Sequence, residues 1–290
     1  PGNLPIASKT LAAAICEALA FCSENTAKAP VSSRTWSPRK TTLPLYTFSS
    51  HAHGKEMTFD QYWQVCNTQS YEPYTKHHLK PLKEKYDAFR ENYKKRYRDV
   101  SEAIRLEMGA PVKLAEGAQT ATGLGHLKTA MRVLEKHKFE YNHENYIVRE
   151  EPIGVCGLIT PWNWPINQIV SKFAPAFAAG CTVVLKPSEI APLSAMIIAE
   201  IIHESQIPPG MFNLVNGLGN VVGEAMSSHK DIDMMSFTGS TRGGVAVAKA
   251  SATNVKRVSQ ELGGKSPNLI LDDNSFNTSI TNGVIHVMGN

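Results

Sequence analysis

Ile159-Thr160-Pro161-Trp162-Asn163-Trp164-Pro165 is the stretch around which this chain of 290 residues is organised. It follows the apolar run 153–158, which is typical of a buried strand, and it precedes a helical pattern in residues 166–180. In open α/β sheets such a strand-to-helix junction is where ligands bind. The prolines stiffen it, and Asn163 offers an uncharged amide that could donate to an oxyanion. A polar turn flanked by packing tryptophans is the alternative interpretation.

The chain after this stretch alternates between strand and helix patterns. Strands are predicted at Val155–Thr160, Thr182–Leu185, Phe212–Val215, Met234–Phe237, Val255–Gln260 and Leu269–Leu271. Helices are predicted at Ile166–Ala179, Leu193–Glu204, Asn220–Ser227 and Arg242–Ala250. Apolar strands that alternate with helices favour the α/β class, with a Rossmann-like, mostly parallel sheet that helices cover on both faces.

The chain before this stretch is predicted to be helical, apart from its beginning. Apolar positions recur at helical spacing at Tyr86, Phe89, Tyr93, Tyr97, Val100 and Ile104. Gly109 and Pro111 should end that helix, and a second helix is expected at about 112–136. Phe139–Arg149 has the pattern of a β-hairpin. A short helix is possible at Leu11–Phe21, and residues 32–42 have the composition of a loop.

Composition excludes several classes of protein. Apolar residues make up 42% of the chain and charged residues 19%, with a net charge of +4, which suits a globular protein without a nucleic-acid stripe. No apolar run is long enough for a membrane span. The five cysteines form no CxxC, so we expect neither a disulfide framework nor a zinc site. Cys156 and Cys181 should be buried, and His51 and His53 should be exposed rather than metal ligands.

Two polar motifs follow predicted strands in the middle of the chain. In Lys186-Pro187-Ser188-Glu189, the lysine can reach a phosphate or ribose hydroxyl, and the carboxylate can bind a ribose diol while repelling a 2′-phosphate. An exposed, solvated turn is the alternative. Gly217-Leu218-Gly219 with Gly223 opens a helix, with one residue more than the Rossmann fingerprint.

Two further motifs follow later strands. Phe237-Thr238-Gly239-Ser240 opens a helix whose free N–H groups could bind an anion, and the glycine would let a phosphate approach the backbone. Glu261-Leu262-Gly263-Gly264-Lys265-Ser266-Pro267 places a carboxylate before two glycines, which suits a general base that must leave room for a cofactor. A structural turn with an ion-paired glutamate is the alternative.

From about Tyr86 to Asn290, these motifs and Leu106-Glu107-Met108-Gly109-Ala110-Pro111 resemble, in their order and spacing, the N-terminal portion of the NAD(P)-dependent aldehyde dehydrogenase superfamily. The resemblance implies NAD as cofactor, with NADP possible and disfavoured by Glu189. The implied cofactor-binding residues are Ile159, Pro161, Trp162, Asn163, Lys186, Ser188, Glu189, Gly219, Gly223, Phe237, Thr238, Gly239, Ser240 and Leu262.

The resemblance also implies a reaction. In the family a cysteine attacks the aldehyde to give a thiohemiacetal, and an asparagine that matches Asn163 and a backbone N–H hold the oxyanion. A glutamate that matches Glu261 activates the water that releases the acid. Lys172 matches a helix lysine near the active site. The hairpin matches an arm that joins subunits, so a homo-oligomer is expected for the full-length protein, in the cytoplasm or in mitochondria.

The same resemblance suggests five regions. These are a divergent or disordered start (1–75), helices of the cofactor domain (76–136), an oligomerisation hairpin (137–152), an NAD-binding domain (153–264) and the start of a truncated catalytic domain (265–290). In relatives a Gly-Gln-x-Cys segment follows the stretch that matches Gly289-Asn290.

We therefore expect the nucleophilic cysteine to lie beyond the printed chain, and these 290 residues alone to be inactive. Three hypotheses remain: part of an active aldehyde dehydrogenase, a short NAD-binding or interaction protein, or a dead gene fragment that does not fold stably. The sequence does not identify the aldehyde.

Overall fold

The computed structural model describes residues 76–264 and 267–288. The predictions for Leu11–Phe21, for residues 32–42 and for His51 and His53 lie outside the described residues.

A parallel sheet is the centre of the fold. Its strands are β3 (Val155–Ile159), β4 (Thr182–Lys186), β5 (Phe212–Leu214), β6 (Met234–Thr238) and β7 (Arg257–Glu261). Their spatial order is β5-β4-β3-β6-β7, and every neighbouring pair is parallel. The α/β class and the parallel sheet predicted from the apolar runs are therefore confirmed.

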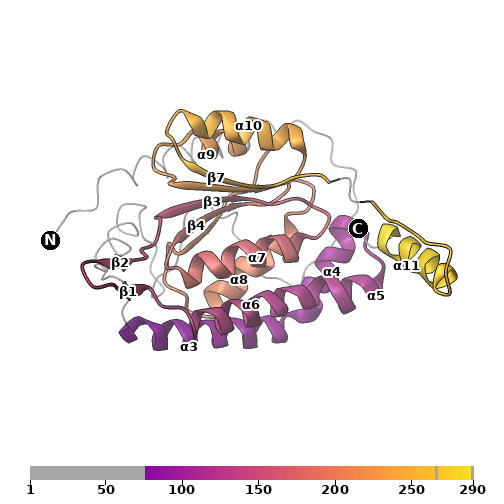
Figure 1. Cartoon of the computed structure of the whole chain (residues 1–290), viewed down its shortest axis with the longest axis horizontal. Helices are drawn as coiled ribbons and strands as arrows, with labels where there is room; N and C mark the ends of the chain where they lie inside the picture. Colours follow the sequence, from indigo (N-terminus) through magenta and orange to yellow (C-terminus); the bar gives the residue numbers. More distant parts are fainter. Residues whose placement is uncertain (1–75, 265–266, 289–290) are drawn as a thin grey trace, which may run out of the picture.

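Helices cover both faces of this sheet (Figure 1). α7 (Pro165–Ala178) and α8 (Leu193–Glu204) lie on one face, and α9 (Glu224–Ser228) and α10 (Thr241–Ala252) lie on the other. The central strand β3 is apolar on both sides for this reason: Leu158 packs in the cluster with α7 and α8, whereas Ile159 packs in the cluster with α9 and α10. Such two-sided burial is typical of parallel sheets.

A further helical layer packs on α7 and α8 (Figure 1). It consists of α3 (Lys76–Lys95), α4 (Tyr97–Met108) and α6 (Thr120–Leu134). The predicted apolar stripe is confirmed, because Tyr86, Phe89 and Tyr93 are buried on α3, and Val100 and Ile104 on α4.

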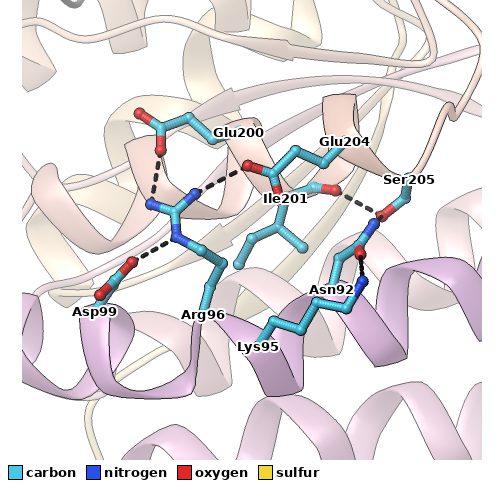
Figure 2. A network of polar contacts seen from close by, with 8 residues as sticks. All are labelled: Asn92, Lys95, Arg96, Asp99, Glu200, Ile201, Glu204 and Ser205. Carbon is cyan, nitrogen blue, oxygen red and sulfur yellow. Dashed lines mark hydrogen bonds and ion pairs between the residues drawn. The ribbon is translucent and has the colours of Figure 1, made fainter. Parts of the chain in front are cut away.

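The predicted first helix is interrupted at Arg96, where α3 ends and α4 begins. The Arg96 guanidinium binds the carboxylates of Asp99, Glu200 and Glu204, and Asn92 donates to Ser205 Oγ at 3.2 Å, as Figure 2 shows. Partial burial opposes the charge, but the hydrogen bonds to the carboxylates outweigh it and raise the pKa of Arg96. Tertiary ion pairs with α8 therefore fix this break, which helical periodicity does not reveal.

The predicted second helix has three parts: α5 (Val112–Leu114), the π-helical turn η1 (Ala115–Gln119) and α6. The predicted hairpin is confirmed as β1 (Glu140–Asn142) paired antiparallel with β2 (Ile147–Arg149). The predicted helix at Asn220–Ser227 is a π-helical turn, η2 (Gly219–Gly223), followed by α9.

The structure differs from the predictions in one strand, one strand boundary and one additional helix. The strand predicted at Leu269–Leu271 is wrong: Leu269 and Leu271 are largely exposed, and no described strand pairs with them. The strand predicted from Val255 begins at Arg257, because Val255 has φ +52° and is exposed. α11 (Phe276–Met288) was not predicted, and none of its residues is buried in the described structure.

Candidate active site

The motifs that follow predicted strands all lie at carboxyl ends of the sheet strands, whereas the motif Leu106–Pro111 lies at the end of α4. The chain builds the sheet outward through β3, β4 and β5, and then crosses to form β6 and β7 on the other side of β3. The strand order therefore reverses between β3 and β6. A crevice outside the carboxyl ends of strands at such a switch point is the usual ligand site of an open α/β sheet.

The turn after β3 is exposed at Trp162 and buried where it joins α7. Trp162 is 47% exposed, whereas Pro165 is buried at the start of α7. Asn163 is partly buried, and its main-chain oxygen accepts a hydrogen bond of 3.1 Å from Nε2 of Gln119. Proline suits the first turn of a helix because its missing N–H would have no helical partner there. The turn therefore has a fixed backbone on either side of the Asn163 amide.

Two hydroxyl groups lie at the switch point without a described partner. Ile159 of β3 pairs with Phe237 of β6, so the next residues, Thr160 and Thr238, are neighbours across the two strand ends. The Oγ1 atoms of Thr160 and Thr238 are buried and have no hydrogen-bond partner among the described residues. A buried hydroxyl without a partner costs free energy. Among the described residues, both hydroxyls therefore lie unpaired and out of contact with solvent beneath the switch point.

The turn after β4 holds an ion pair. Lys186 is only 2% exposed, and its Nζ donates to Glu189 Oε2 and to the main-chain oxygen of Pro187, both at 2.9 Å. Partial burial alone would raise the pKa of Glu189, but hydrogen bonds from Lys186 and from main-chain groups of Glu189 and Gly219 lower it overall. The alternative of a solvated turn is wrong for the lysine, and the carboxylate stays ionised beside η2. Ser188 is partly buried within this turn.

The glycine loop after β5 is open on one side. A Cβ atom at Gly219 would meet nothing within 4 Å, whereas one at Gly223 would lie 3.6 Å from Cδ1 of Ile159. Gly217 has φ +154°, close to the extended region. Gly219 therefore leaves space beside Glu189 that a ligand could use, and Gly223 packs on the end of β3.

The motif after β6 differs from its prediction in one respect. Ser240 caps α10 and accepts a hydrogen bond of 3.2 Å from the Gly243 N–H. A Cβ atom at Gly239 or Gly243 would lie 2.8 or 2.7 Å from Cζ of Phe237. In this structure the Phe237 ring, not an open approach for phosphate, accounts for glycine at these positions.

The end of β7 places an exposed carboxylate near a partly buried lysine. Glu261 is the last residue of β7, and Leu262 packs on Gly244 of α10, where a Cβ atom would lie 2.5 Å from Cδ2 of the leucine. Lys172 of α7 donates to Ser236 Oγ at 2.8 Å. Desolvation lowers the pKa of Lys172, and the charge of Glu261 partly opposes that shift. Lys172 and Glu261 are therefore close enough to interact.

One supporting residue was missed by the sequence reasoning. The Glu107 carboxylate on α4 accepts hydrogen bonds from the main-chain N–H groups of Leu193 at 2.5 Å and Ser194 at 3.1 Å. It thereby caps α8, which has no side-chain cap of its own. α8 begins directly after the turn that carries Glu189. The visible signal was an acidic residue inside a matched motif, but its partner is distant in sequence.

The described cysteines lie away from this edge. Cys156 is near the amino end of β3 and Cys181 directly precedes β4, and both are buried as predicted. A hydrogen bond between the two thiols, together with burial, raises the pKa of Cys156. The same hydrogen bond lowers the pKa of Cys181 to about 6. Both thiols lie at the amino-terminal edge of the sheet, opposite the motifs, so neither can reach a ligand bound near Asn163.

The described residues contain neither a cluster of metal ligands nor a helix suited to a membrane. Residues 76–264 and 267–288 contain no group of three His, Cys, Asp or Glu side chains that could hold a metal ion. No helix in these ranges combines the length and the apolar character that a membrane crossing requires.

Comparison with known proteins gives consistent results. 3-Succinoylsemialdehyde-pyridine dehydrogenase of a Pseudomonas species is 55% identical over 193 residues, which are 66% of this chain and 40% of that relative. A mutant of aldehyde dehydrogenase C from Pseudomonas syringae, crystallised with NAD+ and octanal, is 48% identical to this chain, with a TM-score of 0.70. The match covers 71% of this chain and 43% of the chain of that enzyme. Betaine aldehyde dehydrogenase from Staphylococcus aureus, crystallised with NAD+, is 32% identical to this chain, with a TM-score of 0.67. The match covers 70% of this chain and 41% of the chain of that enzyme.

The chain thus spans between 40% and 43% of the length of these three relatives. A model of the aldehyde dehydrogenase family matches residues 67–290, which is most of the printed sequence. With the parallel sheet and the motifs at its carboxyl edge, this match establishes that the chain belongs to the aldehyde dehydrogenase family.

Proposed function

We propose that the whole protein that contains this chain oxidises an aldehyde to a carboxylic acid with NAD. One observation carries the proposal: Asn163, the Lys186–Glu189 pair and Glu261 come from different strand ends but lie along one edge of the sheet, at its switch point. Family membership supplies the reaction class, and this edge supplies residues of the kinds that the reaction needs.

The described residues fit the cofactor. The exposed carboxylate of Glu189 can accept hydrogen bonds from a ribose diol, and its charge disfavours the 2′-phosphate of NADP. When bound, NAD would supply the oxidising power by accepting a hydride. We propose residues 153–264 as the unit that binds it.

The remaining chemistry is assigned to the protein. A cysteine thiolate of the whole protein would add to the aldehyde carbon, and the carbonyl oxygen would become an oxyanion. The Asn163 amide would donate a hydrogen bond to that oxygen, which stabilises charge as it develops. After oxidation, Glu261 would take a proton from the water that attacks the thioester, so that the acid leaves and the thiolate is restored.

The substrate is proposed only at the level of its reacting group. The three relatives described above are named for, or crystallised with, a pyridine semialdehyde, octanal and betaine aldehyde, respectively. Those molecules share an aldehyde and little else.

The hairpin is proposed as a site of self-association. Tyr141, Tyr146, Ile147 and Val148 are exposed on β1 and β2 and in their connection. Only one edge of each of these two strands is paired among the described residues. Exposed apolar side chains on an open strand edge are typical of a surface that another chain covers. A second copy of the whole protein is the proposed occupant, which sedimentation of wild-type and hairpin-deleted protein would test.

Steady-state NADH formation tests the proposed function. The purified whole protein would receive NAD and a panel of aliphatic, aromatic, semialdehyde and quaternary-ammonium aldehydes. At least one aldehyde should be oxidised, and Asn163→Ala should lower kcat by about 10²–10³-fold, the usual effect of losing an oxyanion donor. Glu84→Gln, on the exposed face of α3, is the control.

The outcomes separate the hypotheses. NAD binding without oxidation of any aldehyde would favour a non-catalytic NAD-binding protein. A protein that binds no NAD would contradict both that alternative and the proposed oxidation. Failure to give a soluble, cooperatively folded protein would favour a dead gene fragment.

A further inference from the structure

We propose that Gln119 is a positioning residue for the oxyanion donor Asn163, an inference that rests on the proposed function. Gln119 is the last residue of the π-helical turn η1, and its side chain is 1% exposed. Its Nε2 donates a hydrogen bond of 3.1 Å to the main-chain oxygen of Asn163. The two residues are 44 positions apart in sequence, so this contact joins the helical layer directly to the turn after β3.

The chemistry of this contact fixes the orientation of the glutamine amide. A main-chain oxygen only accepts hydrogen bonds, so the NH₂ group of Gln119 must face it. The opposite atom, Oε1, is then buried without a hydrogen-bond partner among the described residues. A buried acceptor without a partner costs free energy. Gln119 therefore lowers the free energy of unfolding through this unpaired oxygen, and such groups are found at functional sites.

The contact acts on the part of Asn163 that matters for an oxyanion donor. The carbonyl carbon of Asn163 is bonded to its Cα, so holding the main-chain oxygen restricts the direction in which the side chain leaves the turn. Pro161 and Pro165 restrict the backbone on either side. A donor must be aligned before charge develops if it is to stabilise the transition state.

The π-helical turn itself is held in place by named contacts. Tyr93 donates to the main-chain oxygen of Thr120 at 2.7 Å, and Tyr97 donates to that of Glu116 at 2.5 Å. Thr120 Oγ1 donates to the main-chain oxygen of Ala115 at 2.8 Å. π-helical turns within helices are frequent at functional sites. This one ends on the residue that reaches the Asn163 backbone.

The test compares Gln119→Met with wild type in the whole protein. Methionine keeps the length and approximate volume of the side chain and removes both the donor and the unpartnered acceptor. We expect kcat to fall by about 10- to 100-fold through misplacement of the oxyanion donor. KM for NAD should stay within about twofold. The variant removes the unpartnered Oε1 but also removes the donor to the main-chain oxygen of Asn163, so the two effects oppose each other and the midpoint of thermal unfolding should change little.

A matched control and a double variant separate positioning from a general structural role. Ser101→Ala removes the side-chain hydrogen bond of a buried polar residue in the same helical layer but leaves every described hydrogen bond of η1 and the contact between Gln119 and Asn163 in place, so kcat should be unchanged. If Gln119 acts through Asn163, Gln119→Met should lower kcat no further in an Asn163→Ala background.

Three results would overturn the inference while wild type remains active. These are wild-type kcat in Gln119→Met, a loss of kcat that accompanies an equal loss of thermal stability or NAD affinity, and effects that multiply in the double variant. An inactive wild-type protein would instead contradict the proposed function, so the two failures are distinguishable.

Discussion

Nζ of Lys186 lies 2.9 Å from Oε2 of Glu189, with the lysine buried and the carboxylate exposed at the carboxyl edge of the sheet. The lysine makes its hydrogen bonds inside the turn, to Glu189 and to Pro187. The carboxylate keeps a free face toward solvent. The pair is therefore arranged so that the lysine fixes the carboxylate and the carboxylate meets the ligand.

Glu189→Gln should change the choice between NAD and NADP. The variant keeps hydrogen-bonding atoms for a ribose hydroxyl but loses the charge that repels a 2′-phosphate. NADP should bind about tenfold more tightly, which corresponds to about 1.4 kcal/mol, and NAD a few-fold more weakly. Titration of both dinucleotides by calorimetry measures this, with Glu84→Gln as control. Unchanged affinity for both would place the ribose elsewhere.

Removing the Glu107 cap should destabilise the fold. Glu107→Ala leaves two main-chain N–H groups at the start of α8 without their partner. Loss of a helix cap typically costs about 1 kcal/mol. Glu107→Gln keeps an acceptor and should cost less. Urea unfolding of the three proteins checks this order, and an alanine variant as stable as wild type would contradict it.

The stability difference between wild type and Glu107→Gln should depend on pH. Burial raises the pKa of Glu107 although hydrogen bonds from Leu193 and Ser194 oppose the shift. The native state therefore binds this proton more tightly than the unfolded state does. The contribution of Glu107 is most favourable below the unfolded pKa, and it declines as pH rises through the higher folded pKa.

Glutamine does not titrate, so Glu107→Gln should gain stability relative to wild type between about pH 4 and pH 7. Urea unfolding across this range measures the difference. A relative loss of stability with rising pH would show that the hydrogen bonds outweigh burial and that folding lowers the pKa of Glu107.

Gly123→Ala should be destabilising although alanine favours helices. A Cβ atom at Gly123 of α6 would lie 2.6 Å from the Tyr93 hydroxyl oxygen and 2.9 Å from Cγ2 of Ile166. Overpacking of this kind costs about 1–3 kcal/mol. Gly125→Ala in the same helix is the matched control, because its Cβ would meet nothing within 4 Å. It should raise stability by up to about 1 kcal/mol.

The sequence predicts the strands β3, β4 and β6 well because their apolar runs correspond to strands buried on both faces. It does not predict contacts that depend on tertiary structure. The break at Arg96 exists because carboxylates of α8 lie beside it, and the roles of Gln119 and Glu107 depend on partners 44 and 86 residues away. Leu269–Leu271 has an apolar strand pattern but no described neighbour with which to pair.

Hydrogen–deuterium exchange with and without saturating NAD tests the central claim, that the carboxyl edge of the sheet is the cofactor site. The account predicts slower exchange in four separate segments: residues 159–165, 186–193, 217–224 and 237–244. Exchange in the hairpin, residues 139–150, should not change through direct contact with NAD. Protection restricted to other parts of the chain, or no protection in these four segments at saturating NAD, would contradict the claim.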